Sequence, residues 1–531
     1  MLGKFNPYLL GILLHSVASH TKPPLSWEYE KNEPLPSSQG CHVFFGTGSS
    51  VRFSEDGDTW QFCLPGSCQN NTYFKYIPAT FKPLDARPSP RKHFGMAVLH
   101  TGANQALLFG GISGSVPGSV LLGDTWIYEN TNGKTCTELC DEYSYNTASW
   151  TKVSSSSSPT KRMFSQMVSL GPGKIIMFGG MNGDTFFDDT WVFSRDSGWK
   201  QHFPTSVQHW NGASIPGPVA RIQHAMSAPY FDQVMLFGGA NQDGNVLDDL
   251  WFFNQTVGTQ GQWQYFEKAA TNNWPDGRRE HALTWLSSGN IAGSVLLFGG
   301  SDTENMLKGD TWIYKIKNSN GENVMQWFQV DTGRKDDPDY LDFLSERWGM
   351  ALSSLPDSRA ILSGGTDAYN SKLSSSLIFS INNVSSDGNY SGVWETADVM
   401  GRLNTQAHLD HAIGELGDGK AVLFGGSTGS SSANQEERKV FPDCITRKTG
   451  DVETQDNLTY CDSEGSYFED TWVFDLKKAD SLGIMDGTGV APWSRIRMSS
   501  IRPPKREDHT LTGIDANHAI MFAGLYGEVT L

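Results

Sequence analysis

The chain has 531 residues, of which 38% are apolar and 56 are glycine, and its formal net charge at pH 7 is −17. A negative charge without any run of Lys or Arg excludes a phosphate-binding stripe, so no nucleic acid is expected as a partner. The acidic balance is compatible with cations or basic partners, and it is also what plain solubility requires.

The N-terminus, residues 1–19, has the pattern of a secretory signal peptide. Lys4 precedes a short apolar stretch over 7–14, and small residues suited to signal peptidase follow at Ala18 and Ser19. This stretch is far too short to span a bilayer, and no later stretch approaches eighteen apolar residues. The mature protein is therefore expected to be secreted and extracellular, without a membrane span.

A Gly-Gly doublet recurs six times in this chain, each time after a short apolar run. The intervals between doublets are about 60 to 69 residues. A repeat at a nearly fixed period constrains the architecture before any single residue is interpreted. The doublets are Gly110-Gly111, Gly179-Gly180, Gly238-Gly239, Gly299-Gly300, Gly364-Gly365 and Gly425-Gly426.

Each repeat carries further strand signals. One or two basic residues, then often a histidine, and then an apolar strand precede the doublet. Asp-Thr-Trp or a near relative follows most doublets. The tryptophans of these triplets, including one that stands alone near the N-terminus, are Trp60, Trp126, Trp191, Trp251, Trp312 and Trp472. A second tryptophan trails each unit, at Trp150, Trp199, Trp263, Trp327, Trp394 and Trp493. Four short strand signals per repeat are typical of a four-stranded propeller blade.

The doublet, the Asp-Thr-Trp strand and the trailing tryptophan, in one order and spacing, resemble the kelch family over nearly the whole mature chain. The resemblance implies an all-β propeller with four-stranded antiparallel blades. We expect the apolar run before each doublet to be the inner strand, and the glycines to allow backbone angles and close approaches that a Cβ would block. Large aromatic side chains are expected to fill the gap between neighbouring blades.

The two ends of the chain complement each other. The last repeat begins at Asp508 and stops at Leu531, where Asp-Thr-Trp is due, and the isolated triplet at Asp58 supplies the missing half. A blade closed by both termini makes seven blades in all and removes two sheet edges. The segment 42–48 also resembles an inner strand and could compete with the C-terminal one. The abrupt end is also compatible with a fragment of a longer chain.

The predicted organisation is a signal peptide over 1–19, an N-terminal lead-in over 20–40 and a seven-bladed kelch-type propeller over 41–531. Its repeats start near residues 91, 161, 221, 278, 347, 408 and 506, and the last is completed by 41–77. Two repeats depart from the pattern. Ser363 stands where Phe precedes the fifth doublet, whose unit also lacks Asp-Thr-Trp, and Ala523 replaces the first glycine of the seventh. We expect the ring to be least regular there.

Six of the seven cysteines fall into close pairs, which are Cys63 with Cys68, Cys136 with Cys140, and Cys444 with Cys461. In an oxidising compartment these pairs are expected to form disulfides that pin their loops. Metal ligation is the rival interpretation, but the CxxC spacing and His partners are lacking. Cys41 is left over and could be buried and free, pair with another chain, or pair with a cysteine beyond Leu531.

Five Asn-x-Ser/Thr sequons are present, and each falls in a predicted turn or loop. In a chain with a signal peptide, N-glycosylation of most of them is expected. The sequon asparagines are Asn70, Asn254, Asn383, Asn389 and Asn457.

Histidines recur near the start of five repeats and invite a metal-site interpretation. They are His93, His224, His281, His411 and His509, and the sequence pattern places Met163 and Trp348 at the equivalent position of the other two units. A ring of ligands interrupted by Met and Trp would be unusual, whereas a packing position tolerates both. We therefore expect these histidines to be framework residues, with no metal and no cofactor.

Two enzyme classes on propellers were weighed against a binding role. A galactose-oxidase-like copper enzyme needs an adjacent Tyr-His pair and a Tyr cross-linked to a Cys, and no Tyr-His dipeptide occurs here. A sialidase-like hydrolase is suggested by Asp-box lookalikes at 54–60 and 194–199, but these are incomplete and such boxes are structural turns. We therefore predict no catalytic residues.

The longest connections are expected on one rim of the propeller, where variable loops on a rigid ring usually carry binding residues. They are residues 203–219, 267–277, 331–345, 427–467 and 477–504. The alternative is that such loops are neutral insertions. The sequence therefore predicts a secreted, glycosylated module that binds an extracellular protein or glycan, or that belongs to an extracellular matrix.

Overall fold

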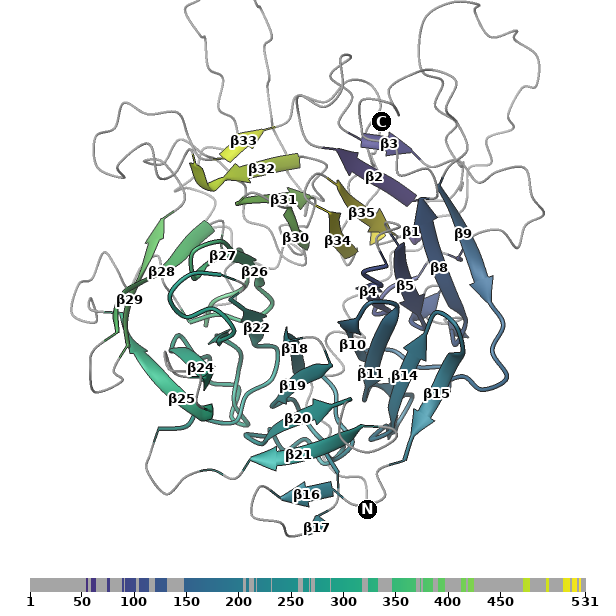
Figure 1. Ribbon diagram of the computed structural model, residues 1–531, viewed down its shortest axis with the longest axis horizontal. Coiled ribbons are helices and arrows are strands. Elements are labelled where there is room, and N and C mark those ends of the chain that lie inside the picture. The colour runs from purple at the N-terminus through teal and green to yellow at the C-terminus, as the bar shows by residue number, and fades with distance from the viewer. Residues whose placement is uncertain are drawn as a thin grey trace, which may run out of the picture.

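Antiparallel strands in groups of four make up the protein, as a computed structural model shows (Figure 1). The residues that the structure describes are 54–55, 59–63, 74–76, 88–89, 91–101, 105–113, 120–130, 148–203, 207–209, 214–215, 217–230, 232–255, 261–266, 268, 273–286, 288–317, 323–332, 346–368, 373, 376–384, 390–396, 412–416, 419–424, 471–477, 493–495, 510–515, 518–522 and 525–526. Within these ranges the strands form seven four-stranded units, which we call blades 1 to 7.

The first five blades follow the chain in order. Blade 1 contains β4 (Gly95–Val98), β5 (Gln105–Phe109), β8 (Thr125–Asn130) and β9 (Ala148–Val153). Blade 2 contains β10 (Gln166–Gly171), β11 (Lys174–Phe178), β14 (Thr190–Ser194) and β15 (Gly198–His202). Blade 3 contains β18 (Ala225–Tyr230), β19 (Gln233–Phe237), β20 (Leu250–Asn254) and β21 (Gln262–Phe266). Blade 4 contains β22 (Ala282–Trp285), β23 (Val295–Phe298), β24 (Thr311–Lys317) and β25 (Asn323–Asp331). Blade 5 contains β26 (Ala351–Leu355), β27 (Arg359–Ser363), β28 (Ser376–Val384) and β29 (Tyr390–Thr396).

The remaining strands complete the ring. Blade 6 contains β30 (Ala412–Leu416), β31 (Lys420–Phe424), β32 (Thr471–Asp475) and β33 (Trp493–Arg495). Blade 7 contains β34 (Thr510–Asp515), β35 (His518–Phe522), β2 (Thr59–Cys63) and β3 (Phe74–Tyr76). Three shorter pairs lie outside the blades: β1 (Ser54–Glu55) with β36 (Leu525–Tyr526), β6 (Ile112–Ser113) with β7 (Val120–Leu121), and β12 (Met181–Asn182) with β13 (Thr185–Phe186). The pair of β16 (Val207–His209) with β17 (Ser214–Ile215) extends the sheet of blade 3 beyond β21.

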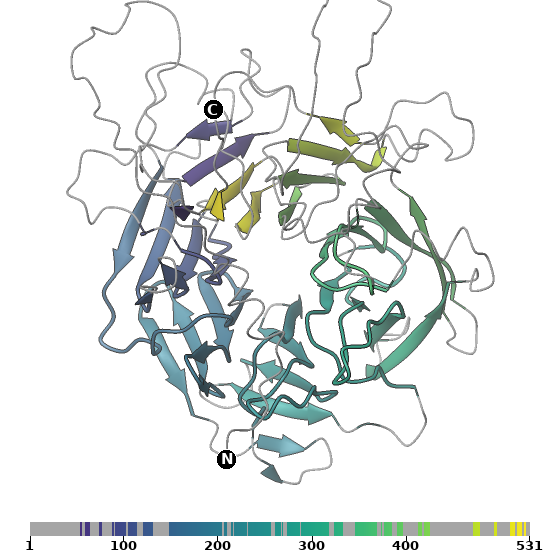
Figure 2. The ribbon, with the colours of Figure 1, turned by 180° about the vertical axis from the view of Figure 1, so that it is seen from behind.

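The first strand of each blade lies at the centre of the ring. Each contacts the first strand of the next blade, and β34 of blade 7 contacts both β30 of blade 6 and β4 of blade 1. The contacts therefore run around a complete circle, and both sides of the molecule show the blades around one centre (Figures 1 and 2). In such a ring every blade packs between two neighbours.

Blade 7 is built from both ends of the chain, as the sequence predicts. Strand β2 pairs with β35 over its whole length, so that Trp60 lies opposite Met521. The N-terminal Asp-Thr-Trp strand thus continues the sheet that the C-terminal repeat begins. Segment 42–48, the rival inner strand, lies outside the described residues.

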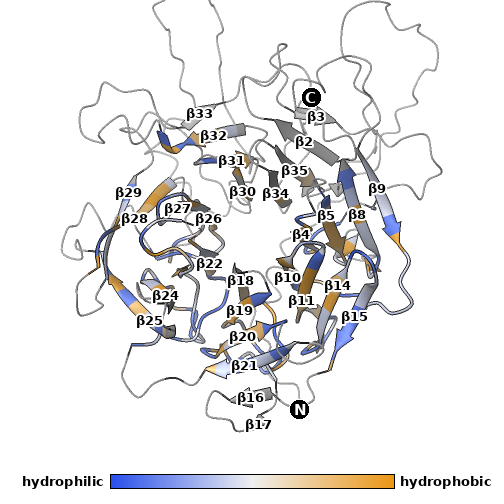
Figure 3. Ribbon diagram, viewed as in Figure 1, coloured by the Kyte–Doolittle hydropathy of each residue, from blue (hydrophilic) through white to orange (hydrophobic). Residues whose placement is uncertain are grey.

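The apolar run before each doublet is the second strand of its blade, so the prediction that it is the innermost strand is wrong. The innermost strand is the preceding one, for example β4 in blade 1. Every residue of β5 is buried, because β5 has bonded strands on both edges and neighbouring blades over both faces. Double coverage explains the continuous apolar run, which gives β5 and β11 much of their hydrophobic colour in Figure 3.

The glycine doublets allow close contact between blades, as predicted. Gly110 and Gly111 have φ angles of +70° and +94°. A Cβ on Gly110 would lie 2.6 Å from the carbonyl oxygen of Arg162, which already accepts a 2.8 Å hydrogen bond from the Gly111 amide. Corresponding contacts link blades 2, 3 and 4 to the blade that follows each. A side chain at these positions would push two blades apart.

The trailing tryptophans fill the space between blades, which confirms the role expected for them. Trp263 of blade 3 packs edge-on against Phe178 of blade 2, and its Nε1 donates to Thr190 Oγ1 at 2.8 Å. Trp199 and Trp394 make the same bond to the threonine of the preceding blade's Asp-Thr-Trp. In blade 3 that threonine is replaced by Leu250, and the buried Nε1 of Trp327 has no hydrogen-bond partner.

Replacing Thr190 by valine is expected to lower the free energy of unfolding by about 1–2 kcal/mol, because the buried Trp263 Nε1 loses its acceptor while shape is kept. Urea unfolding of the purified protein measures the change. The control is Thr185→Val at an exposed site, which should change stability by less than about 0.5 kcal/mol. Equal effects of the two substitutions would contradict the role of the threonine.

Few of the predicted modification sites fall on described residues. Cys63 ends β2, and the other cysteines lie outside the described residues, as do Asn70, Asn389 and Asn457. Asn254 is the last residue of β20, and exposed Asn383 lies within β28, so the prediction of a loop is wrong for both. β28 continues to pair with β29 beyond a bulge near Ile381. Among the described residues no helix is long and apolar enough to cross a membrane.

Candidate interaction face

The connections within each blade alternate between two sides of the ring because successive strands are antiparallel. Those from the second to the third strand emerge on the same side as those from the fourth strand to the next blade. We call this side the loop face. The described parts of these connections include the β6–β7 and β12–β13 hairpins and residues 240–249 and 301–310.

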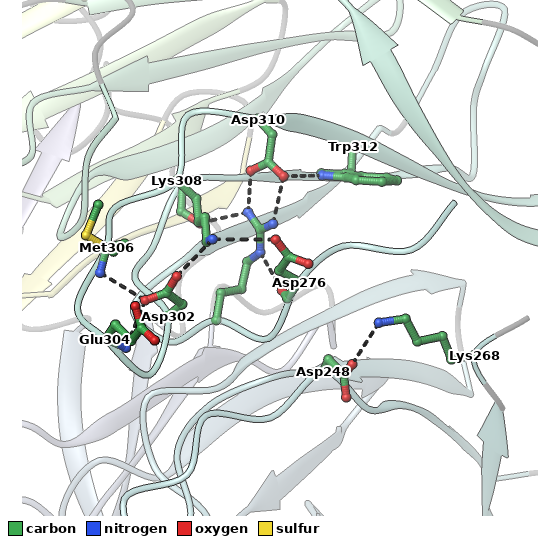
Figure 4. A network of polar contacts seen from close by, with 11 residues as sticks. Asp248, Lys268, Asp276, Asp302, Glu304, Met306, Lys308, Asp310 and Trp312 are labelled. Atoms are coloured by element: carbon green, nitrogen blue, oxygen red, sulfur yellow. Dashed lines mark hydrogen bonds and ion pairs between the residues drawn. The ribbon is translucent and has the colours of Figure 1, made fainter. Parts of the chain in front are cut away.

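A buried arginine anchors the loop face of blade 4. Arg278 has no exposed side-chain surface, and its Nη1 donates to the Gly299 carbonyl at 3.2 Å and to Asp310 Oδ1 at 2.7 Å. Its Nη2 donates to Asp310 Oδ2 at 2.8 Å, which also accepts from Trp312 Nε1 at 2.6 Å (Figure 4). One guanidinium thus ties the doublet to the Asp-Thr-Trp strand with the bidentate geometry of the strongest ion pairs.

Three other blades repeat this arrangement. Buried Arg91, Arg162 and Arg221 donate to the first doublet glycine's carbonyl and to Asp124, Asp189 and Asp249 respectively. Burial alone would raise the pKa of Asp124 and Asp310, but the hydrogen bonds and charge of the paired arginines outweigh it and lower both values. The basic residue and the triplet aspartate are visible in most repeats of the sequence, but only the structure brings them together.

Blade 5 has the arginine without the triplet aspartate. Arg347 is buried and donates to the Gly364 carbonyl at 3.0 Å. Burial lowers the pKa of Arg347 to about 10, against the opposing effect of the Asp367 charge. Ser363 and Ser376, which face each other in β27 and β28, lie 3.2 Å apart at their hydroxyl oxygens. The blade keeps all four strands, and its outer strand β29 also pairs in parallel with β25 of blade 4, at Val330–Tyr390 and Asp331–Ser391.

A hydrogen-bonded turn presents Met306 on the loop face of blade 4. Asp302 Oδ1 accepts from the amides of Glu304 and Met306, each at 2.9 Å, and Lys308 Nζ lies 2.9 Å from Asp302 Oδ2 (Figure 4). Asn305 takes the left-handed conformation, φ +63°, and its Oδ1 accepts from Arg279 Nη2. These bonds hold the turn in place while the Met306 side chain is 59% exposed.

Exposed large hydrophobic side chains gather on the loop face. Val120 and Met306 occupy equivalent positions after the second strands of blades 1 and 4, each next to a residue that bridges back toward the doublet. Phe203 and Val219 lie on the connection from blade 2 to blade 3. These four are 47–64% exposed, and the fifth exposed large hydrophobic among the described residues, Val384, lies at the end of β28 on the opposite side.

Negative charge predominates among the described side chains of the loop face. Two of its lysines are already in ion pairs: Lys268 with Asp248 at 3.2 Å, and Lys308 with Asp302 and Asp276. Carboxylates of further exposed residues lie on the same connections, at Asp184, Asp188, Asp243, Glu304 and Glu346. The face therefore combines apolar side chains with a surplus of carboxylates.

The five repeated histidines do not share one position, which corrects the sequence analysis. His224 and His281 are equivalent, because each is the residue that a Cβ on the second doublet glycine of its blade would contact. The same contact falls on Phe94 in blade 1, which places His93 one residue earlier. It falls on Ser165 and Met350 in blades 2 and 5, so Met163 and Trp348 are not equivalents either. His411 and His509 lie outside the described residues.

His224 and His281 are packing residues between blades. They are 2% and 7% exposed, and their rings meet Phe178 and Phe237 of the preceding blade edge-on. Burial lowers both pKa values, that of His281 to about 3, and the charge of the neighbouring arginine acts in the same direction. The carbonyls of Arg278 and Phe237 oppose this effect, but neither has hydrogen-bond geometry with the His281 ring.

Blades 1 to 4 each place one residue with a left-handed backbone on the loop side, just before the first strand. His93, Phe164, Gln223 and Glu280 all have φ near +55°. Neighbours touch: the rings of His93 and Phe164 are 4.4 Å apart, and Gln223 Nε2 donates to Glu280 Oε1. Burial raises the pKa of Glu280. Apart from His93, these positions carry no signal in the sequence, because their shared backbone conformation is reached with four different residue types.

The long connections predicted to carry binding residues are only partly described. Residues 203–219 contain β16 and β17, and β16 pairs in parallel with the outer strand β21, so this segment is partly sheet. In 267–277, Trp274 is buried against the blade. The range 477–504 includes β33, the outer strand of blade 6. Residues 427–467, and 333–345 of the connection 331–345, lie outside the described residues.

Neither enzyme class gains a site from these arrangements. Within the described ranges no three His, Cys, Asp or Glu side chains are grouped as ligands of a metal ion. The Asp-box lookalike at 194–199 is the turn between β14 and β15, closed by a bond from the Ser197 amide to the Ser194 carbonyl. It is therefore a structural turn, as expected.

Known proteins share the repeat. An F-box/kelch-repeat protein of Arabidopsis thaliana is 24% identical over 354 residues, which cover 64% of this chain and 66% of that protein. Kelch domain-containing protein 2 of Bos taurus is 30% identical over 158 residues, 27% of this chain and 36% of that protein. The chain is a kelch-repeat protein. Its kelch repeats supply the blades, the doublets and the arginine anchors described above.

The matched regions span less than two thirds of either relative. The likeness therefore concerns only part of each relative, and both relatives are named for their kelch repeats. No protein-family model matches the chain. The solved structure of YjhT aligns with a TM-score of 0.38 at 14% identity, covering 64% of this chain and 95% of that one.

Proposed function

We propose that this kelch propeller is a protein-binding module that contacts its partners through the loop face. The observation that carries this proposal is the placement of Val120, Phe203, Val219 and Met306 on one side of the ring. Exposed apolar side chains rimmed by charges are typical of protein interaction sites. The hydrogen bonds of the Asp302 turn hold Met306 in place, and Arg221 Nε donates to the Val219 carbonyl. Such fixed positions reduce the entropy lost on binding.

A variant with Val120→Ser, Phe203→Ser and Met306→Ser is expected to lose at least about 90% of the partner captured by the wild type, because apolar contacts supply most of the binding free energy. Quantitative affinity capture with tagged protein measures this loss. The matched control is Val384→Ser, an exposed apolar residue on the opposite side, which should retain capture. Loss in the control and retention in the triple variant would contradict the proposed face.

We further propose that the protein acts outside the cell, where it binds a protein or a glycan or forms part of a matrix. The support is the signal-like segment 1–19, together with the sequons and the paired cysteines. Expression of the full chain in cultured animal cells is expected to deliver it to the medium, with its N-terminus after Ala18 or Ser19. Removal of N-glycans should lower its apparent mass. Retention in the cell with an intact N-terminus would contradict this location.

We propose binding rather than catalysis as its activity. The two histidines that the structure describes at the recurrent position are buried between blades, where their rings meet aromatic side chains of the preceding blade. Copper analysis of the purified protein addresses the oxidase alternative, and hydrolysis of a fluorogenic sialoside addresses the sialidase alternative. Stoichiometric copper or turnover of the sialoside would overturn the binding-only proposal.

A further inference from the structure

Blade 3 covers part of its own loop face with a lysine and a tryptophan. Asp248 directly precedes the anchored Asp249. Lys268 Nζ lies 3.2 Å from Oδ2 of Asp248 (Figure 4). Trp274, from the same connection as Lys268, donates its Nε1 hydrogen to the Asp248 carbonyl at 2.8 Å. The Trp274 side chain is only 9% exposed and packs among the apolar residues of blades 3 and 4.

Blade 2 presents the same aspartate, and among the described residues no lysine or arginine forms an ion pair with it. Asp188 precedes the anchored Asp189 as Asp248 precedes Asp249, and it is exposed. Phe203 follows His202, which pairs with Thr190, so Phe203 and Asp188 lie near the loop-side ends of the paired strands β14 and β15. Phe203 is 64% exposed, in contrast to buried Trp274.

Val219 completes this surface from the other side. The Arg221 amide donates to the Phe187 carbonyl, and Arg221 Nε donates to the Val219 carbonyl. These bonds bring Val219, which is 47% exposed, to the strand end that carries Asp188. We call Asp188, Phe203 and Val219 the Phe203 patch. The exposed carboxylate of Asp184, in the adjoining hairpin, adds to its negative charge.

We propose that the Phe203 patch is a docking site for a partner segment that presents a lysine or arginine beside an aromatic or aliphatic side chain. This inference rests on the proposed function and names its partner class. The cation takes the place on Asp188 that Lys268 takes on Asp248, and the apolar side chain covers Phe203 and Val219. The carboxylates of Asp184 and Asp188 disfavour an acidic segment, because like charges across an interface are repulsive.

Selection of random 12-residue peptides displayed on phage against the immobilised wild-type protein tests this proposal. The enriched peptides are expected to carry Lys or Arg within a few residues of Trp, Phe, Leu or Ile. Synthetic copies should bind more weakly as the salt concentration rises, because exposed charges are screened. Selection that enriches no peptide, or only peptides without a basic residue, would overturn the partner class.

Variants then locate the bound peptide. Phe203→Ser is expected to weaken binding about tenfold or more, and Asp188→Asn about threefold to tenfold. The controls are Asp243→Asn, an exposed acid on the same face, and Val384→Ser, which should each change the affinity by less than about twofold. All four sites are exposed, so the thermal midpoints should match that of the wild type.

Two failures are distinguishable. Peptides that require Phe203 but carry no basic residue would overturn the partner class and leave the loop face as the binding surface. Peptides that require Val384 and not Phe203 would overturn both this inference and the proposed function.

Discussion

Asp310→Asn is expected to lower the free energy of unfolding by about 3–5 kcal/mol, because the substitution leaves the buried guanidinium of Arg278 without its counter-charge. Both carboxylate oxygens of Asp310 accept from Arg278, and one also accepts from Trp312. Asparagine offers one acceptor oxygen and turns an NH₂ group toward the guanidinium. The loss reflects an uncompensated buried charge and a broken network more than the worth of one ion pair.

Urea unfolding followed by tryptophan fluorescence measures this loss. The control is Asp243→Asn, which removes the same charge from an exposed turn of blade 3 and should shift stability by less than about 0.5 kcal/mol. A loss below about 1 kcal/mol in Asp310→Asn would mean that the anchor is not what holds the doublet to the Asp-Thr-Trp strand.

Lowering the pH from 7 to 5 is expected to remove about 3–4 kcal/mol of stability through His224 and His281 together. Burial lowers both pKa values below the ordinary 6.5, that of His281 to about 3. A base with a lowered pKa in the fold takes up its proton first in the unfolded chain. Its contribution is therefore complete above pH 6.5 and is lost as the pH falls from about 6.5 toward the folded value.

The variant His224→Met with His281→Met isolates this effect, because Met350 already fills the same position in blade 5. Its stability should fall by about 3–4 kcal/mol less than that of the wild type between pH 7 and 5. Burial raises the pKa of Glu280, so the contribution of Glu280 to stability increases as the pH falls. Glu280 is present in both proteins, so this contribution cancels in the comparison. Parallel pH profiles for the two proteins, from urea titrations at each pH, would contradict the buried-neutral histidines.

The repeat made most of the fold predictable from the sequence. A doublet at a nearly fixed period implies equivalent units, and the isolated Asp-Thr-Trp at Asp58 implied the pairing of β2 with β35. Local chemistry was predictable for the same reason. Close backbone approach at Gly110 and Gly111, and tryptophans between blades, both follow from residue type and position.

What could not be predicted depends on pairing across space. Burial by bonded sheet edges and burial by neighbouring blades give the same apolar pattern in a sequence, so this pattern does not distinguish the second strand of a blade from the innermost one. The shift of one residue between His93 and His224 becomes visible only when the doublet of the same blade fixes the register. The pairing of β16 with β21 joins segments far apart in the sequence, and neither segment carries a local signal of it.

The proposed function depends on the loop face as the binding surface, and hydrogen exchange on the protein with and without a selected peptide tests it most directly. Slowed exchange is expected in segments of the loop face, such as 181–188 and 217–222. Segments of the opposite side, such as 171–174 and 356–359, should exchange at unchanged rates. Protection confined to the opposite side would contradict the loop face as the binding surface.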